Sequence, residues 1–155
     1  MSLIERVLTT LNALGVSPEV REFAASTATA EAAASALGTS VERIVKSLVF
    51  ATPDGQPILA LVSGANRVDL DRLSTVVGQR VGRANADQVR QATGFSIGGV
   101  PPVGHHAALP VYVDADLLRF DQVWAAAGTP NSVFAITPHD LVRVANGQVV
   151  TLKAQ

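Results

Sequence analysis

Residues 46–62 read KSLVFATPDGQPILALV and predict a β-hairpin. Two runs rich in β-branched, aromatic and aliphatic residues, Lys46 to Thr52 and Pro57 to Val62, flank the four residues PDGQ. The Asp-Gly pair in this connection tolerates the positive φ that a hairpin turn requires. We therefore expect two neighbouring strands joined at residues 53–56.

The first residue of this hairpin, Lys46, is one of only two lysines among the 155 residues. Because side chains alternate along a strand, Lys46 would share its face with Leu48 and Phe50, and the residues between them would take the other face. An ammonium along an apolar wall is unfavourable unless it is paired or meets an anion. Its stem can carry the charge to the surface, the charge can protect an edge strand, or the ammonium can contact an anion or a carbonyl group.

Composition indicates one compact domain spanning residues 1–155, because 48% of the residues are hydrophobic and only 16% are charged. The chain has no cysteine, which excludes a disulfide framework, a thiol nucleophile and a thiolate metal site. Its three histidines lack HExxH-like spacing. We expect neither a metal nor another cofactor.

A net charge of −1 argues against a protein that binds nucleic acid by neutralising many phosphates. Any contact with RNA would be local or shared with another protein. Five arginines do fall within residues 67–90, and the solvated face of a helix explains them equally well: Arg67, Arg72, Arg80, Arg83 and Arg90.

The N-terminal residues 1–16 have the apolar periodicity of an amphipathic helix that ends at Gly15. They lack the basic start and the cleavage site of a signal peptide, and no apolar run reaches the roughly 18 residues of a membrane span. We expect a cytoplasmic protein without a membrane partner.

Capping residues and turn residues delimit the remaining elements. Helices are predicted at 30–37 between Thr29 and Gly38, at 69–77, from Asn85 to Gly94, and after Thr137. Strands are predicted at 19–23, 109–113, 119–126 and 132–136, although residues 123–127 could also form a buried helical turn. This pattern indicates an α/β protein of the α+β type, with a mixed, largely antiparallel sheet and flanking short helices.

The candidate chemistry is confined to Lys46 and the loop GGVPPVG at residues 98–104. Paired carboxylates, a GxSxG elbow, a Walker A motif and a dinucleotide-binding GxGxxG are all absent. Glycines let backbone N–H groups approach a ligand closely, and prolines stiffen the segment. Such a loop can hold a carbonyl oxygen or a phosphate, although many Gly-Pro loops are simple turns.

Five segments, taken in order, resemble the YbaK family, which includes the editing domain inserted in bacterial prolyl-tRNA synthetase. The resemblance runs from about residue 19 to residue 150. The segments are TAEAA (29–33), IVKSLVF (44–50), SGANRVD (63–69), ATGFSIGGVPPVG (92–104) and TPHDL (137–141).

This resemblance implies a trans-editing aminoacyl-tRNA deacylase. Such an enzyme hydrolyses the ester between a wrong amino acid and the 3′ adenosine of a tRNA, commonly tRNA(Pro). The resemblance implies attack by a water, assisted by the free ribose hydroxyl, without a protein nucleophile or a metal. Lys46 corresponds to the family's key lysine, expected to grip a phosphate or polarise the ester. Gly98 to Pro102 correspond to its glycine loop, and we assign the amides of Gly98 and Gly99 to the ester carbonyl.

The amino-acid pocket is expected between the helix start at Thr29, the Lys46 strand and the turn from Gly128 to Asn131. Ser63, Pro101 and Pro102 are further candidates for substrate binding. Residues 127–131 read AGTPN, which departs from the serine, basic or histidine-bearing segments of some relatives and leaves specificity open. Few polar candidates line this pocket, so we expect a small, mostly apolar amino acid.

Two other functions fit the same residues. The chain could be a non-catalytic module that binds tRNA ends or a synthetase, or a metal-free esterase that acts on small molecules. For the deacylase, prolyl-tRNA synthetase or an elongation factor could deliver the tRNA. His105 and His106 could touch RNA or be exposed turn residues, and His139 is expected on the surface.

Overall fold

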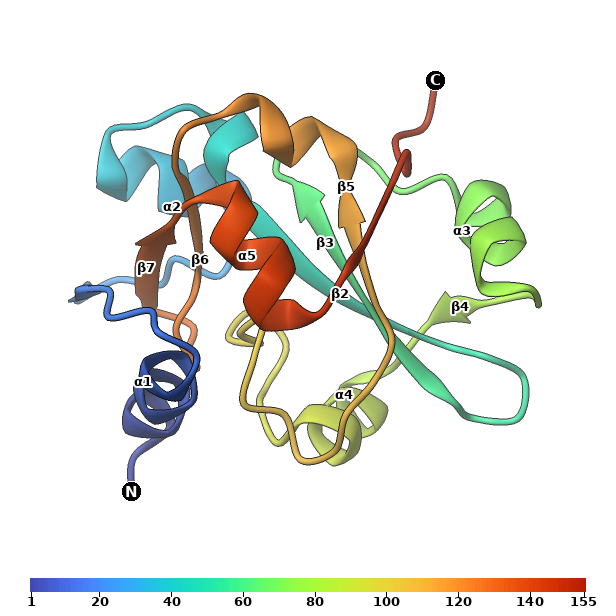
Figure 1. Cartoon of the computed structure of the whole chain (residues 1–155), viewed down its shortest axis with the longest axis horizontal. Coiled ribbons are helices and arrows are strands. Elements are labelled where there is room, and N and C mark those ends of the chain that lie inside the picture. The colour runs from blue at the N-terminus through green and yellow to red at the C-terminus, as the bar shows by residue number, and fades with distance from the viewer.

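The computed structural model describes all 155 residues, and the predicted hairpin lies at the centre of its larger sheet. Strands β2 (Val45–Ala51) and β3 (Pro57–Ser63) pair antiparallel along their full length. The sheet has five strands in the order β4-β2-β3-β5-β8 (Figure 1). Strand β4 (Gly82–Arg83) pairs antiparallel with β2, whereas β5 (Val111–Asp114) and β8 (Gln148–Val150) extend the other side in parallel.

A second sheet has three antiparallel strands in the order β1-β7-β6. These strands are β1 (Val20–Glu22), β7 (Ser132–Ile136) and β6 (Val123–Ala126). A single parallel bridge between Ile44 and Trp124 joins the two sheets at the start of β2. The prediction of a mixed, largely antiparallel arrangement is confirmed, with the strands divided between two sheets.

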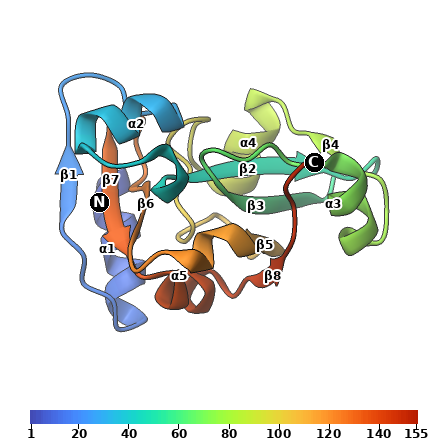
Figure 2. The same cartoon turned by 90° about the horizontal axis from the view of Figure 1, so that it is seen from above.

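Five short helices flank these sheets, and each begins at a side chain that accepts a hydrogen bond from the backbone of its first turn. Thr29, Asn85 and Thr137 perform this capping role as predicted. Helix α2 lies beside β6 and β7 in both views (Figures 1 and 2). The helices are α1 (Leu3–Ala13), α2 (Ala30–Leu37), α3 (Leu70–Val77), α4 (Ala86–Thr93) and α5 (Pro138–Ala145).

The predicted strand over 119–126 is wrong for its first four residues. A 3₁₀ helix over Ala115–Arg119 occupies the start of this segment, and only Val123–Ala126 is a strand, which also excludes the buried helical turn. The 3₁₀ helix begins at Asp114, whose carboxylate accepts a hydrogen bond from the N–H of Asp116. Such a side-chain contact leaves no trace in a hydrophobic pattern.

The core confirms the alternation predicted for β2. Val45 and Val49 belong to the main apolar cluster, whereas Phe50 belongs to a second cluster that includes Leu73 of α3. Lys46 therefore lies on the same face of the sheet as Phe50. None of the helices combines the length and apolar character needed to cross a membrane.

Candidate active site

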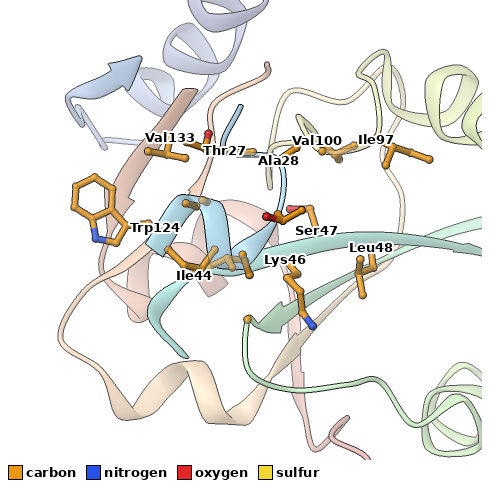
Figure 3. Close-up of a pocket in the computed structure, with 18 of the residues that line it drawn as sticks. Thr27, Ala28, Ile44, Lys46, Ser47, Leu48, Ile97, Val100, Trp124 and Val133 are labelled. Atoms are coloured by element: carbon orange, nitrogen blue, oxygen red, sulfur yellow. The ribbon is translucent and has the colours of Figure 1, made fainter. Parts of the chain in front are cut away.

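A pocket of about 480 Å³ opens where the start of β2 meets helix α2, the glycine loop and strand β6 (Figure 3). Fifteen of its 23 lining residues are hydrophobic, so its few polar groups are candidates for orienting a ligand. Three of the residues predicted for the site line it: Thr29, Lys46 and Gly98. The pocket thus joins the lysine to the glycine loop, as the sequence suggested.

Lys46 lies at the rim of this pocket with its ammonium turned away from the cavity. Its side chain and that of Ser47 leave opposite sides of β2 (Figure 3). The Lys46 Nζ donates a hydrogen bond to the backbone carbonyl of Asn66. Of the three explanations for a lysine on this face, the structure shows the carbonyl contact, made to the protein's own backbone.

Burial lowers the pKa of Lys46 below its usual value of 10.5. Among the nearby charges, Glu31 and Asp114 raise this pKa, while Arg83 and Arg67 lower it. The folded protein therefore holds this proton less tightly than the unfolded chain does. The contribution of Lys46 to stability should rise as the pH increases from its folded-state pKa to 10.5, because the unfolded chain holds this proton more tightly in that window.

We expect the Lys46 side chain to titrate below pH 10.5. The physical cause is the loss of hydration around a partly buried ammonium. The measurement is a pH titration of the lysine side-chain signals by NMR, in which the Lys46→Ala variant assigns one of the two lysines. A Lys46 that titrates at or above 10.5 would contradict the prediction.

The carbonyl that receives Lys46 is held by a partly buried network at the end of β3. The side-chain amide of Asn66 donates to Asp114 and to Asp116, at 2.8 Å in each case. Asp114 is only 1% exposed and also accepts from the N–H of Ser63 at 3.1 Å. The carboxylates of Asp114, on β5, and Asp116, just after it, therefore fix the position of Asn66, whose carbonyl receives Lys46.

The glycine loop contributes Gly98 directly to the pocket wall. Gly98 has a φ of +88°, and a Cβ at this position would lie 2.8 Å from the Cβ of Ala28. The backbone N–H of Gly98 has no hydrogen-bond partner within the chain. The N–H of Gly99, by contrast, donates to the carbonyl of Ser96 at 2.9 Å. Of the two amides assigned to a substrate carbonyl, only that of Gly98 has no partner.

Replacing Gly98 with alanine should lower activity about tenfold and destabilise the fold by about 1–2 kcal/mol. Alanine is strained at positive φ, and its Cβ would press on Ala28 at the pocket wall. Gly55→Ala is the matched control, because Gly55 has a φ of +84° with nothing within 4 Å of its Cβ position. Deacylation kinetics and thermal melting of both variants test this. Equal activity in the two variants would contradict it.

The other predicted residues support the pocket without lining it. Pro101 and Pro102 are buried, and the Pro101 carbonyl accepts a hydrogen bond from His105 Nε2 at 2.7 Å. Ser63 is also buried, and its hydroxyl donates to the Glu42 carbonyl at 2.8 Å. Gly99 packs on the backbone of Thr129.

The turn predicted to form one pocket wall lies behind that wall. Gly128 packs against Leu3 and Phe95, and the Asn131 amide donates to the Phe23 carbonyl at 2.7 Å. The wall on this side is made instead by Trp124 to Ala126 and by Val133. The turn was assigned to the pocket because it lies between β6 and β7 in the sequence. Side chains alternate along a strand, so residues adjacent in the sequence can face different surroundings, and only the strand residues line the pocket.

Several lining residues were not predicted. Ser47 and Ala28 adjoin predicted positions, and Arg83 belongs to the arginine-rich stretch and lies over the Phe50 ring at 5.7 Å. Proximity in sequence to Lys46 and Thr29 was the available signal for the first two.

The three histidines lie outside the pocket. His139 is exposed at the start of α5, as predicted, whereas His105 is half-buried against the Phe95 ring. Burial lowers the pKa of His105, and its Nε2 contacts the Pro101 carbonyl of the glycine loop. His106 is exposed, and its Nδ1 lies 3.4 Å from the carbonyl of Gln91. No group of three or more His, Cys, Asp or Glu side chains is placed to hold a metal ion.

The fold and the pocket define a small α/β domain with an apolar cavity, one unpartnered glycine amide at its wall and one lysine at its rim. The profile of the aminoacyl-tRNA editing domain matches residues 24–144. The chain therefore belongs to this family, and the resemblance to YbaK proteins is confirmed.

Individual relatives agree with this assignment. The chain is similar to the uncharacterized protein YwhH of Bacillus subtilis, with 37% identity over 79% of this chain and 78% of the relative. It is 28% identical to the "putative Cys-tRNA(Pro)/Cys-tRNA(Cys) deacylase EbsC" of Enterococcus faecalis, over 77% of this chain and 73% of that protein. A proline–tRNA ligase of Nitratidesulfovibrio vulgaris is 34% identical over 57% of this chain, which corresponds to 16% of the ligase.

A solved structure described as a "putative trans-editing enzyme for prolyl tRNA synthetase" has nearly the same fold. It superimposes with a TM-score of 0.93 at 46% identity, covering 100% of this chain and 99% of the other. The match over the whole chain includes both sheets and all the elements around the pocket.

Proposed function

We propose that this protein hydrolyses the ester of mischarged aminoacyl-tRNA in trans, and that its substrate is tRNA(Pro) carrying a small amino acid. The observation that carries the proposal is the shared pocket, in which an unpartnered glycine amide and a lysine lie at the rim of an apolar cavity. Family membership supports the reaction class, and the similarity to a trans-editing enzyme for prolyl-tRNA synthetase supports the choice of tRNA.

The reaction needs little beyond positioning, because an aminoacyl ester is already activated. A water attacks the ester carbonyl carbon, the bond to the ribose 3′ oxygen breaks, and that oxygen leaves with a proton. The free ribose hydroxyl next to the ester assists the attacking water. The N–H of Gly98 donates to the oxygen that becomes negative, and one such donor is worth about 10²–10³ in rate.

Lys46 would contact the terminal nucleotide of the tRNA. Its ammonium is held by a single contact, to Asn66, and its flexible stem allows it to turn toward a phosphate or the ester oxygen. The apolar walls then receive the amino-acid side chain. A pocket distinguishes amino acids that differ by one methylene only weakly, which is the physical reason for a second, hydrolytic check on the charged tRNA.

The near-neutral net charge of the protein suggests that another protein helps to deliver the tRNA. With a net charge of −1, the protein has no large electrostatic attraction for the tRNA backbone. We propose that prolyl-tRNA synthetase or an elongation factor presents the tRNA to this protein in the cytoplasm. Measuring deacylation with and without each partner at rising salt tests this part.

The direct test is hydrolysis of tRNA(Pro) charged with alanine, cysteine, serine, threonine or 2-aminobutyrate, with and without a chelator. We expect loss of the ester from at least one of these substrates, unaffected by the chelator. Binding of charged tRNA without hydrolysis would instead favour a non-catalytic module, and turnover of simple esters alone would favour a small-molecule esterase.

A further inference from the structure

The outer edge of β2 is unpaired at Ser47. Strand β3 covers one edge of β2 along its full length, but β4 covers the other edge only at Phe50 and Ala51. Beyond β4, the N–H of Ala84 donates to the Val49 carbonyl at 3.0 Å. At the start of the strand, Ile44 forms the bridge to Trp124. Ser47 lies between these two contacts, at the pocket.

The register of the hairpin determines which backbone groups face this open edge. Gly64 N–H donates to the Ile44 carbonyl at 2.7 Å, and Thr52 N–H donates to the Gln56 carbonyl at 3.0 Å. In an antiparallel pair, every second residue directs both its N–H and its C=O to the partner strand. Lys46, Leu48 and Phe50 therefore bond to β3, and the N–H and C=O of the intervening residues point the other way.

Ser47 therefore carries three polar groups that neither β3 nor β4 pairs with. Its N–H and C=O point to the open edge, and neither takes part in any hydrogen bond outside the strand ladders. Its hydroxyl is shielded from solvent and also has no hydrogen-bond partner. Buried polar groups without a partner are rare in native proteins, so the Ser47 hydroxyl and the open strand edge beside it mark this part of the pocket as a place for a ligand.

We propose that the Ser47 backbone binds the aminoacyl group as a one-residue strand, with the Ser47 carbonyl accepting from the α-ammonium and the Ser47 N–H donating to the ester carbonyl oxygen. This inference rests on the proposed function. An aminoacyl ester has its donor and its acceptor on either side of one Cα, which is the spacing of a single strand residue. It can therefore form both hydrogen bonds of an antiparallel pair, as peptides do when they extend a sheet edge.

The pairing also determines where the amino-acid side chain goes. Directly opposite residues in a sheet project their side chains to the same face. The substrate side chain would therefore lie on the Ser47 face of β2, toward Ala28 and Val100, and away from Lys46 (Figure 3). The α-amino group is recognised by the backbone carbonyl oxygen of residue 47, which does not depend on the side chain at that position. The open edge of β2 would therefore bind any α-aminoacyl group, and the pocket walls would discriminate between amino-acid side chains.

Amide hydrogen exchange measured by NMR tests this proposal residue by residue. The probe is a non-hydrolysable analogue in which an amide joins alanine to the 3′ position of adenosine. In the free protein, we expect the Ser47 amide to exchange quickly while those of Lys46 and Leu48 are protected by β3. Saturation with the analogue should slow exchange at Ser47 at least tenfold. A Ser47 amide that is already protected, or that does not respond at saturation, would overturn the proposal.

A second ligand tests the α-ammonium contact. The same analogue without its amino group, a propionyl amide, should bind about 10- to 100-fold more weakly, the effect of losing a charged hydrogen bond. Equal affinity of the two ligands would overturn this contact. If mischarged tRNA is hydrolysed while Ser47 does not respond, the present inference is wrong and the proposed function stands. If neither hydrolysis nor analogue binding occurs, the proposed function is wrong as well.

A backbone substitution measures the catalytic share of the Ser47 N–H. Replacing the amide N–H of residue 47 by an ester oxygen, through chemical synthesis of the chain, should lower kcat about 10²–10³-fold. The same replacement at Phe50 is the control, because that N–H bonds to β3 and lies outside the pocket. It should lower the melting temperature and leave kcat of the folded protein unchanged. Equal kcat in both proteins would contradict the proposal.

Discussion

Replacing Lys46 with alanine will lower kcat/KM for deacylation of mischarged tRNA about 10²–10³-fold while the protein stays folded. The ammonium is the one lysine charge at the pocket rim, and its only hydrogen bond is to the Asn66 carbonyl. Removing it therefore takes a charge from the site and little from the fold. Steady-state kinetics and thermal melting of the variant provide the measurement.

Two further variants make the Lys46 result specific. Lys153→Ala removes the other lysine, whose side chain is 54% exposed, and should leave the rate within about twofold. Lys46→Arg keeps the charge but replaces a compact ammonium by a planar fork, so we expect it to recover only part of the activity. Full activity in Lys46→Ala would remove the lysine from the mechanism. A loss of stability matching the loss of rate would assign it a structural role.

Replacing Asp114 with alanine should lower the free energy of unfolding by about 3 kcal/mol. Its carboxylate is 1% exposed and accepts hydrogen bonds from the backbone of Ser63 and Asp116 and from the side chain of Asn66. Alanine would leave these buried donors without their acceptor. The melting temperature should fall by roughly 6–12 °C, as measured by calorimetry.

The matched control for Asp114 is Asp116→Ala. The Asp116 side chain is 28% exposed, accepts from the same Asn66 amide and lies 3.8 Å from Lys153. Asp116→Ala should lower the free energy of unfolding by about 1 kcal/mol, because water can take over the hydrogen bonds of a partly solvated carboxylate. Activity should fall in Asp114→Ala as well, since Asn66 positions the carbonyl that holds Lys46. Similar melting temperatures for the two variants would contradict the assignment of Asp114 as the central acceptor.

Most helices and strands could be predicted because their signals are local. The hydroxyl of Thr29, the amide of Asn85 and the hydroxyl of Thr137 each begin a helix within three residues of themselves, so the sequence shows them directly. The alternation from Val45 to Phe50 likewise separates the two faces of β2 without reference to any other segment. The lysine and the glycine loop were identified from residue type and from the family resemblance.

The elements that were not predicted depend on partners far away in the chain. β4 is two residues long and exists as a strand only because β2 pairs with it, and β8 needs β5 in the same way. The 128–131 turn was assigned to the pocket from its neighbours in sequence, but its contacts with Leu3 and Phe23 place it behind the wall. Such contacts span more than 100 residues, and no local pattern encodes them.

The sequence by itself determined the type of each main element, the two faces of the central hairpin and the pair of features that meet at the pocket, because those depend on capping, turn geometry and side-chain alternation within a few residues. Only the tertiary structure decided that the Lys46 ammonium donates to the Asn66 carbonyl, that the Gly99 N–H donates to Ser96 within its own turn, and that the edge of β2 is open at Ser47. These features are hydrogen bonds made or left unmade between distant segments, and the register of strand pairing sets them.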